Sequence, residues 1–234
     1  MFPDELKNRE WKIGDPILVN RIRWDKNELE YIKKVFEADW FGAREFNREF
    51  EEKFASFIGT KFFQTTSSGS SAILAVCHTL IHKGILKRGD KILHPALTFP
   101  TSISSAIREG LKPVFVDCDP GTYVISTEGI KEAIKLHPDI KGAVIPALLG
   151  NIPNMDVLKE SLGDKPLILD SCDTVGSKWD NKEFGSLGTF GAYSFYGSHH
   201  ITTAGVGGGF STDDSELYKL GKSITFWGRD FDVE

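Results

Sequence analysis

The sequence has few cysteines, no run of basic residues and no long apolar stretch. Its three cysteines, Cys77, Cys118 and Cys172, are odd in number and far apart, so we expect buried free thiols rather than a disulfide framework or a CxxC metal site. The net charge is −5 with both signs interspersed, which excludes the basic footprint of a nucleic-acid-binding protein. No apolar run approaches the roughly 20 residues of a membrane span, and the N-terminus lacks the apolar segment of a signal peptide. We therefore expect a cytoplasmic globular protein that binds neither nucleic acid nor membrane.

Short apolar runs alternate with helical patterns along most of the chain. This alternation predicts an α/β fold with a mostly parallel sheet between helices. In such sheets, ligands bind at the carboxyl ends of the strands. The expected strands are 91–94, 113–117, 142–147, 166–169 and 192–195, and the expected helices are 25–38, 46–57, 71–82, 100–109, 127–136 and 155–162.

The stretch TTSSGSSA, residues 65–72, leads into one of these helices. A glycine between serines at a helix N-terminus offers backbone N–H groups, hydroxyl donors and the positive end of the helix dipole. Gly69 and Ser70 are therefore candidates for binding a phosphate. Simple N-capping by Ser68 or Ser70 is the alternative. The GK[ST] signature of a Walker loop is absent.

Two carboxylates and one aromatic ring are further candidates. In LILDSCDTVG, residues 167–176, an apolar run leads directly into Asp170 and then Asp173. A buried carboxylate requires a partner, and the protonated ring nitrogen of a pyridine cofactor would serve. A helix cap or a turn is the alternative. Phe99, before a helix that starts with proline, could lie flat against a planar ring, with core packing as its alternative.

A polar segment and a glycine cluster follow the last expected strand, in GAYSFYGSHHITTAGVGGGF, residues 191–210. Ser194 is followed by the adjacent pair His199 and His200, with no acidic residue or lysine in the segment. Imidazoles titrate near neutral pH and can move protons. A surface loop that happens to hold two histidines is the alternative.

Taken in order, these motifs resemble the sugar-nucleotide branch of the fold-type I pyridoxal-phosphate (PLP) enzymes, the DegT/DnrJ/StrS-like sugar aminotransferases. The resemblance runs from about residue 22 to residue 230 and includes FVDCDPGTY from Phe115 and ALLGNIPNMD from Ala147. It implies an N-terminal arm and helix over 1–45 and a cofactor-binding large domain over 46–234. It also implies a homodimer with active sites at the interface. The chain stops at Glu234 where relatives continue into a smaller domain, so that C-terminal domain is expected to be missing, in a fragment or a natural truncation.

The resemblance also implies roles for the candidate residues. The cofactor phosphate would be bound by the start of the helix and by a serine, the ring would be stacked by an aromatic side chain, and its nitrogen and phenolic oxygen would each meet a carboxylate. Gly69, Ser70 and Ser194 would thus bind the phosphate, and Phe99 would stack on the ring. Asp170 would meet the ring nitrogen, and Asp173 would lie near the phenolic oxygen.

One departure from the aminotransferase pattern changes the expected reaction. The fourth residue after the Phe of the SF motif is, in the aminotransferases, the lysine that forms the internal Schiff base. Here it is His199, and no lysine lies between Lys182 and Lys219. The motif SFYGSHHIT resembles the nucleotide-sugar 3-dehydratases, which carry a histidine there. This implies a dehydratase of deoxysugar and surface-polysaccharide biosynthesis, dependent on pyridoxamine phosphate (PMP). His199 would be the base and then the acid in removing the C3 hydroxyl of an NDP-4-keto-6-deoxyhexose, and His200 a positioning residue.

Other functions stay open from the sequence. A sugar aminotransferase that has changed its lysine is one alternative, and a noncatalytic relic that binds cofactor or dimerises is another. Val206 stands in the glycine cluster where relatives carry a glutamate. Residues 231–233, after the motif WGRD, are Phe, Asp and Val where one branch begins its cluster-binding cysteines. We therefore expect no iron–sulfur cluster and favour glutamate as the amino donor.

Overall fold

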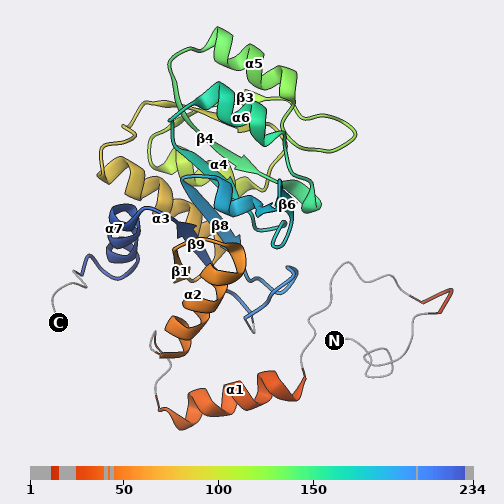
Figure 1. Cartoon of the computed structure of the whole chain (residues 1–234), viewed down its shortest axis with the longest axis vertical. Helices are drawn as coiled ribbons and strands as arrows, with labels where there is room; N and C mark the ends of the chain where they lie inside the picture. The colour runs from red at the N-terminus through yellow and green to blue at the C-terminus, as the bar shows by residue number, and fades with distance from the viewer. Residues whose placement is uncertain (1–11, 16–24, 40–41, 43–44, 204, 230–234) are drawn as a thin grey trace.

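The computed structural model describes residues 12–15, 25–39, 42, 45–203 and 205–229 (Figure 1). Its centre is a seven-stranded sheet with the order β1-β9-β8-β5-β4-β2-β3. The strands from β8 to β3 are parallel, whereas β9 runs antiparallel to both β1 and β8. The sheet strands are β1 (Phe62–Thr66), β2 (Lys91–Pro95), β3 (Lys112–Val116), β4 (Ile140–Pro146), β5 (Leu167–Asp170), β8 (Phe190–Ser194) and β9 (Gly208–Thr212).

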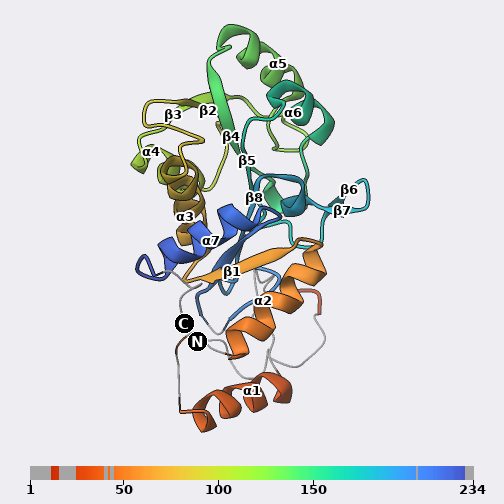
Figure 2. The ribbon, with the colours of Figure 1, turned by 60° about the vertical axis from the view of Figure 1, so that its left-hand side comes forward.

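Helices cover both faces of the sheet. The α-helices are α1 (Lys26–Glu37), α2 (Glu45–Ile58), α3 (Gly69–His82), α4 (Pro100–Arg108), α5 (Thr127–Leu136), α6 (Met155–Leu162) and α7 (Ser215–Thr225). Helices α3, α4 and α7 contribute to the core on one face, and α5 and α6 to the core on the other (Figure 2). Helix α2 packs over β1 and β8 through a separate aromatic cluster. A small hairpin, β6 (Lys178–Trp179) and β7 (Lys182–Glu183), and two short 3-10 helices, η2 (Leu148–Gly150) and η3 (Phe184–Leu187), complete the described elements.

The expected α/β architecture is confirmed, and its five expected strands are the five parallel ones. Strands β1 and β9 and helix α7 were not predicted from the sequence. For β9 the reason is local, since this strand reads GGFST and glycine is depleted in strands. Helix α3 also begins two residues earlier than expected, at Gly69, because Ser68 is its N-cap.

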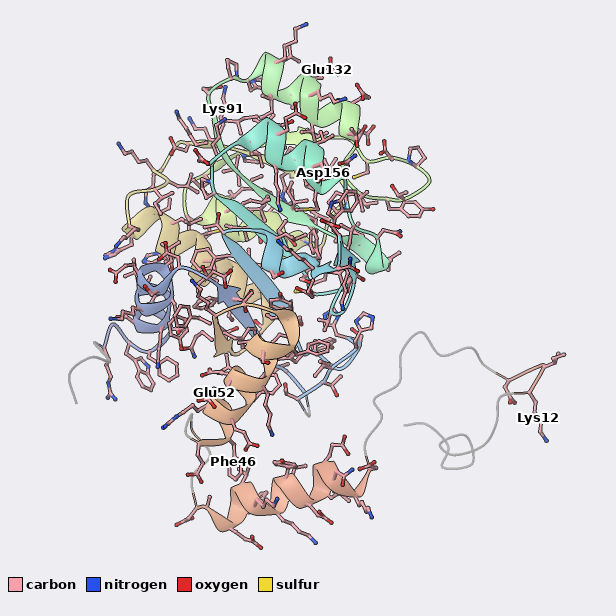
Figure 3. All side chains as sticks on the ribbon, in the orientation of Figure 1. Lys12, Phe46, Glu52, Lys91, Glu132 and Asp156 are labelled. Atoms are coloured by element: carbon pink, nitrogen blue, oxygen red, sulfur yellow. The ribbon has the colours of Figure 1, made fainter. Side chains whose placement is uncertain are left out.

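The expected N-terminal arm falls mostly outside the described residues. Helix α1 forms as predicted and begins with a capping box between Asp25 and Glu28. It has no buried residue, and the ring of its Tyr31 lies edge-on to the ring of Phe46, at 6.5 Å between centroids. Figure 3 labels Phe46, at the start of α2.

All three cysteines are free thiols. Cys77 is buried, and burial raises its pKa to about 12, whereas Cys118 and Cys172 are only partly buried. The described residues include no group of three or more His, Cys, Asp or Glu side chains placed to hold a metal ion. Among the described helices, none combines the length and apolar character that crossing a bilayer requires.

Close backbone packing joins β9 to the start of α3. A Cβ atom added at Gly208 would lie 2.2 Å from the carbonyl carbon of Ser68 and 2.3 Å from the nitrogen of Gly69. A Cβ atom at Gly69 would lie 2.8 Å from the Cβ of Ser194. The two glycines therefore let β8, β9 and α3 meet at one point.

We expect Gly208→Ala to lower the free energy of unfolding by about 1–3 kcal/mol, because backbone atoms must shift to admit the methyl group. Gly121→Ala is the control, since a Cβ atom there meets nothing within 4 Å. Urea unfolding of both variants would measure the difference, and equal stabilities would contradict the packing argument.

A buried carboxylate joins the hairpin to the sheet. Glu183 accepts hydrogen bonds from the hydroxyls of Tyr193, at 2.8 Å, and Ser171, at 3.1 Å, and from the backbone N–H of Ser186, at 3.2 Å. Burial raises the pKa of Glu183 above its usual value, and these hydrogen bonds oppose that effect. The folded pKa lies above the unfolded one, so the stability this group contributes is present below the unfolded pKa and is lost as the pH rises through the folded pKa.

We expect Tyr193→Phe to cost about 1–3 kcal/mol at pH 8, because the buried Glu183 carboxyl loses a donor and a larger fraction of it is ionised there than at lower pH. The cost should fall at pH 5 because a protonated carboxyl needs that donor less. Urea unfolding at both pH values measures the effect, with the half-exposed Tyr123→Phe as control. An equal cost at the two pH values would count against this role of the hydroxyl.

Candidate active site

The candidate residues gather at the carboxyl ends of β5 and β8. Asp170 is the last residue of β5 and pairs in register with Pro146 of β4 and Ala192 of β8. Side chains alternate along a strand, and Ile168 of β5 belongs to the core beneath α3 and α4. Asp170, two residues on, therefore faces the same helices.

Asp170 is 5% exposed and accepts two hydrogen bonds from uncharged groups. The hydroxyl of Ser102, a fully buried residue of α4, donates to one oxygen, and the backbone N–H of Cys172 donates to the other at 3.2 Å. Within the described residues, Asp170 forms no ion pair with a lysine, arginine or histidine. A buried carboxylate with only neutral donors suits a cationic ligand. Ser102 was not singled out from the sequence.

The start of α3 leaves two backbone donors ahead of the first helical hydrogen bond. The N–H of Ala72 donates to the carbonyl of Ser68, and the N–H of Ser71 donates to the Ser68 hydroxyl. The N–H groups of Gly69 and Ser70 come before these two donors in the chain, where a helix offers no carbonyl partner of its own. The hydroxyl of Ser70 donates to Thr101 of α4, so Ser68 and not Ser70 is the cap.

The other two candidates flank these groups. Ser194 is buried at the end of β8, directly beneath Gly69. Phe99 precedes α4 and is 64% exposed, so the alternative of core packing is wrong for its ring. An exposed aromatic face beside the carboxyl edge of the sheet is available to a planar ligand.

Two candidates from different loops lie within hydrogen-bond distance of each other. The Nδ1 atom of His199 lies 3.2 Å from Oδ1 of Asp173, and the two side chains are 19% and 37% exposed. The hydrogen bond from His199 lowers the pKa of Asp173, an effect that partial burial opposes. His200 is exposed. The sequence carried a weak sign of this pair, since Asp173 and His199 each follow the end of one of two neighbouring strands, β5 and β8.

A separate cavity of about 630 Å³ lies beside α3 and is lined by that helix, by β1 and by the ends of α4 and α7. Its lining includes Ser67 and Ser71 from the start of that helix, Arg108 and Glu109 from the end of α4, and Phe226. It contains none of the predicted site residues.

Comparison with known proteins places this arrangement in a family. The chain is 38% identical over 210 residues to the lipopolysaccharide biosynthesis protein RfbH of Salmonella typhimurium, covering 87% of this chain and 47% of that protein. It is 35% identical over 201 residues to GDP-4-keto-6-deoxy-D-mannose 3-dehydratase of Escherichia coli O55:H7, covering 84% of this chain and 51% of that one.

A search of solved structures finds proteins of the same kind. A crystal structure of GDP-4-keto-6-deoxymannose-3-dehydratase with a trapped PLP-glutamate geminal diamine matches with a TM-score of 0.89 at 32% identity, covering 94% of this chain and 57% of that one. The chain thus spans about half the length of the relatives it matches. Residues 23–232 match the model of the DegT/DnrJ/EryC1/StrS aminotransferase family, and the chain belongs to that family.

Proposed function

We propose that the chain is the cofactor-binding part of a PMP-dependent nucleotide-sugar 3-dehydratase acting on an NDP-4-keto-6-deoxyhexose. The observation that carries the proposal is His199, paired with Asp173 at the position of the aminotransferase lysine. No lysine lies between Lys182 and Lys219 to replace it. Relatives named as 3-dehydratases for a GDP sugar and for a dTDP sugar, at 35% and 36% identity, support the same reaction class.

The residues present fit the cofactor. Asp170, buried and served by neutral donors, would accept the ring N–H, and the N–H groups of Gly69 and Ser70 with the hydroxyl of Ser194 would bind the phosphate. The exposed Phe99 would lie against the ring. When bound, PMP supplies an amine that condenses with a ketone and a protonated ring that delocalises electrons released by proton removal. The position of Asp173 beside the phenolic oxygen stays a prediction.

His199 would move one proton. Its neutral imidazole would take a proton in the first half of the reaction. The imidazolium would then return that proton to the departing C3 hydroxyl, which leaves as water. One side chain thus serves first as base and then as acid, and the proton that it takes up leaves in the water molecule.

The remaining expectations concern the whole protein. Glutamate as amino donor is supported by the solved relative that holds a PLP-glutamate adduct. The homodimer and the cytoplasmic location stay predictions. So does the lack of an iron–sulfur cluster, because residues 230–234 lie outside the described residues.

A trapping experiment tests the noncovalent cofactor. We expect PMP and PLP to bind with absorbance changes, and borohydride after PLP to leave no adduct within residues 191–203 in mass spectrometry. His199→Lys should gain an adduct at residue 199, because an amine then replaces the imidazole. A lysine adduct on the unaltered chain, formed with PLP and borohydride and prevented by PMP added beforehand, would place a lysine in the site and contradict the proposal.

A product assay tests the reaction. With a GDP-4-keto-6-deoxyhexose, PLP and glutamate, we expect a 3-deoxy ketosugar, and His199→Asn should lower its formation at least about 10²-fold through loss of acid–base catalysis. His82→Asn, at the exposed end of α3, is the control. An aminosugar product would instead indicate an aminotransferase, as in the relative named GDP-perosamine synthase, 32% identical. Failure of a folded chain to bind PMP would contradict the proposal for this chain and favour a noncatalytic relic, or a part that binds cofactor only together with the remaining length of its relatives.

A further inference from the structure

We propose that Asp173 is a positioning residue that holds a proton on Nδ1 of His199 and so leaves the Nε2 lone pair free to accept one. The inference rests on the proposed function of His199 as a base. Its geometric foundation is the close contact between the two side chains, 3.2 Å from Nδ1 to Oδ1.

The backbone around Asp173 is fixed by a buried turn. The N–H of Thr174 donates to the carbonyl of Ser171 at 3.2 Å, and the hydroxyls of the same two residues lie 2.9 Å apart. The Ser171 hydroxyl also donates to the buried Glu183. Ser171 and Thr174 are both fully buried. The carboxylate of Asp173 is therefore presented from a rigid support at the end of β5.

The loop that carries His199 is closed by backbone hydrogen bonds. The N–H of His199 donates to the carbonyl of Tyr196 at 2.9 Å. Farther along, the N–H of Thr203 donates to the carbonyl of Phe195, whose own N–H donates to Gly207. The imidazole thus has one side toward Asp173, while 19% of the side chain stays accessible.

A strained turn lies near Asp173. Leu149 of η2 has left-handed backbone angles, φ 55° and ψ 31°, which are rare for a residue other than glycine. Such strain persists where the surroundings fix it. Here Asn151 donates to the carbonyls of Leu148 and Thr122, and the Ser177 hydroxyl donates to that of Gly150. The backbone N–H of Leu149 adds to the effect of His199 in lowering the pKa of Asp173.

The charge of Asp173 determines which atom carries the hydrogen between the two side chains. A carboxylate with a lowered pKa is ionised at neutral pH and only accepts hydrogen bonds. The Nδ1 atom must therefore donate, and in the neutral ring Nε2 then carries the lone pair. A free neutral imidazole favours the opposite tautomer, with its proton on Nε2. A carboxylate has this same role beside the catalytic histidine of serine hydrolases.

The test is the tautomer of His199 in the cofactor-free chain, read by ¹⁵N NMR of histidine-labelled protein at alkaline pH. His199→Gln assigns the signal. We expect Nδ1–H to dominate in the unaltered chain and Nε2–H to dominate in Asp173→Ala. The matched control is Asp156→Ala on α6, whose carboxylate accepts a hydrogen bond from Trp179 and should leave the tautomer unchanged. Dehydration by Asp173→Ala should fall by about 10²–10⁴-fold.

Two results would overturn the inference. One is a dominant Nε2–H form in the unaltered folded chain, which decides the matter even if Asp173→Ala does not fold. The other is an unchanged Nδ1–H form in a folded Asp173→Ala. Because the tautomer is read without cofactor or substrate, an Nδ1–H form in a chain that fails to dehydrate would support the pairing and refute the proposed function.

Discussion

A buried carboxylate at the end of a parallel strand constrains the rest of this site. Asp170 is stable there only with hydrogen-bond donors on both oxygens, and these come from α4 and from the turn after β5. Because strand side chains alternate, the face that holds Asp170 is also the face covered by α3 and α4. The anion-binding start of α3 and the exposed Phe99 before α4 are thus brought to the same edge of the sheet as the carboxylate.

The buried polar groups beneath the carboxyl ends of β5 and β8 support the structure, whereas those above them face the site. Glu183 binds Ser171 and Tyr193, and through them it fixes the turn after β5 and the middle of β8. Both strands lead directly into the loops that carry Asp173 and His199. The buried network therefore supports the partly buried pair of Asp173 and His199, and such support holds a reactive side chain in one orientation.

The sequence predicted what depends on local pattern. Apolar runs and helical spacing located the five parallel strands, and the order of short motifs located Asp170, Ser194 and the start of α3. What it did not predict depends on contacts across the sheet. Strand β9 consists of GGFST, whose glycines indicate a loop until close packing on Ser68 and Gly69 is seen. The sequence around Ser102 gives no sign of its role, because only the fold places its hydroxyl against Asp170. The pairing of Asp173 with His199 likewise requires β5 and β8 to be neighbours.

The antiparallel pairing of β1 with β9 joins residues 62–66 to residues 208–212, which are far apart in the sequence. Contacts between such distant segments are slow to form, since the loop between them must close first. During synthesis, the start of α3 emerges early, yet the glycine that packs against it is made long afterwards. The anion-binding turn is completed only when β9 inserts between β1 and β8, so assembly of the sheet and formation of the site are expected to be one late kinetic event.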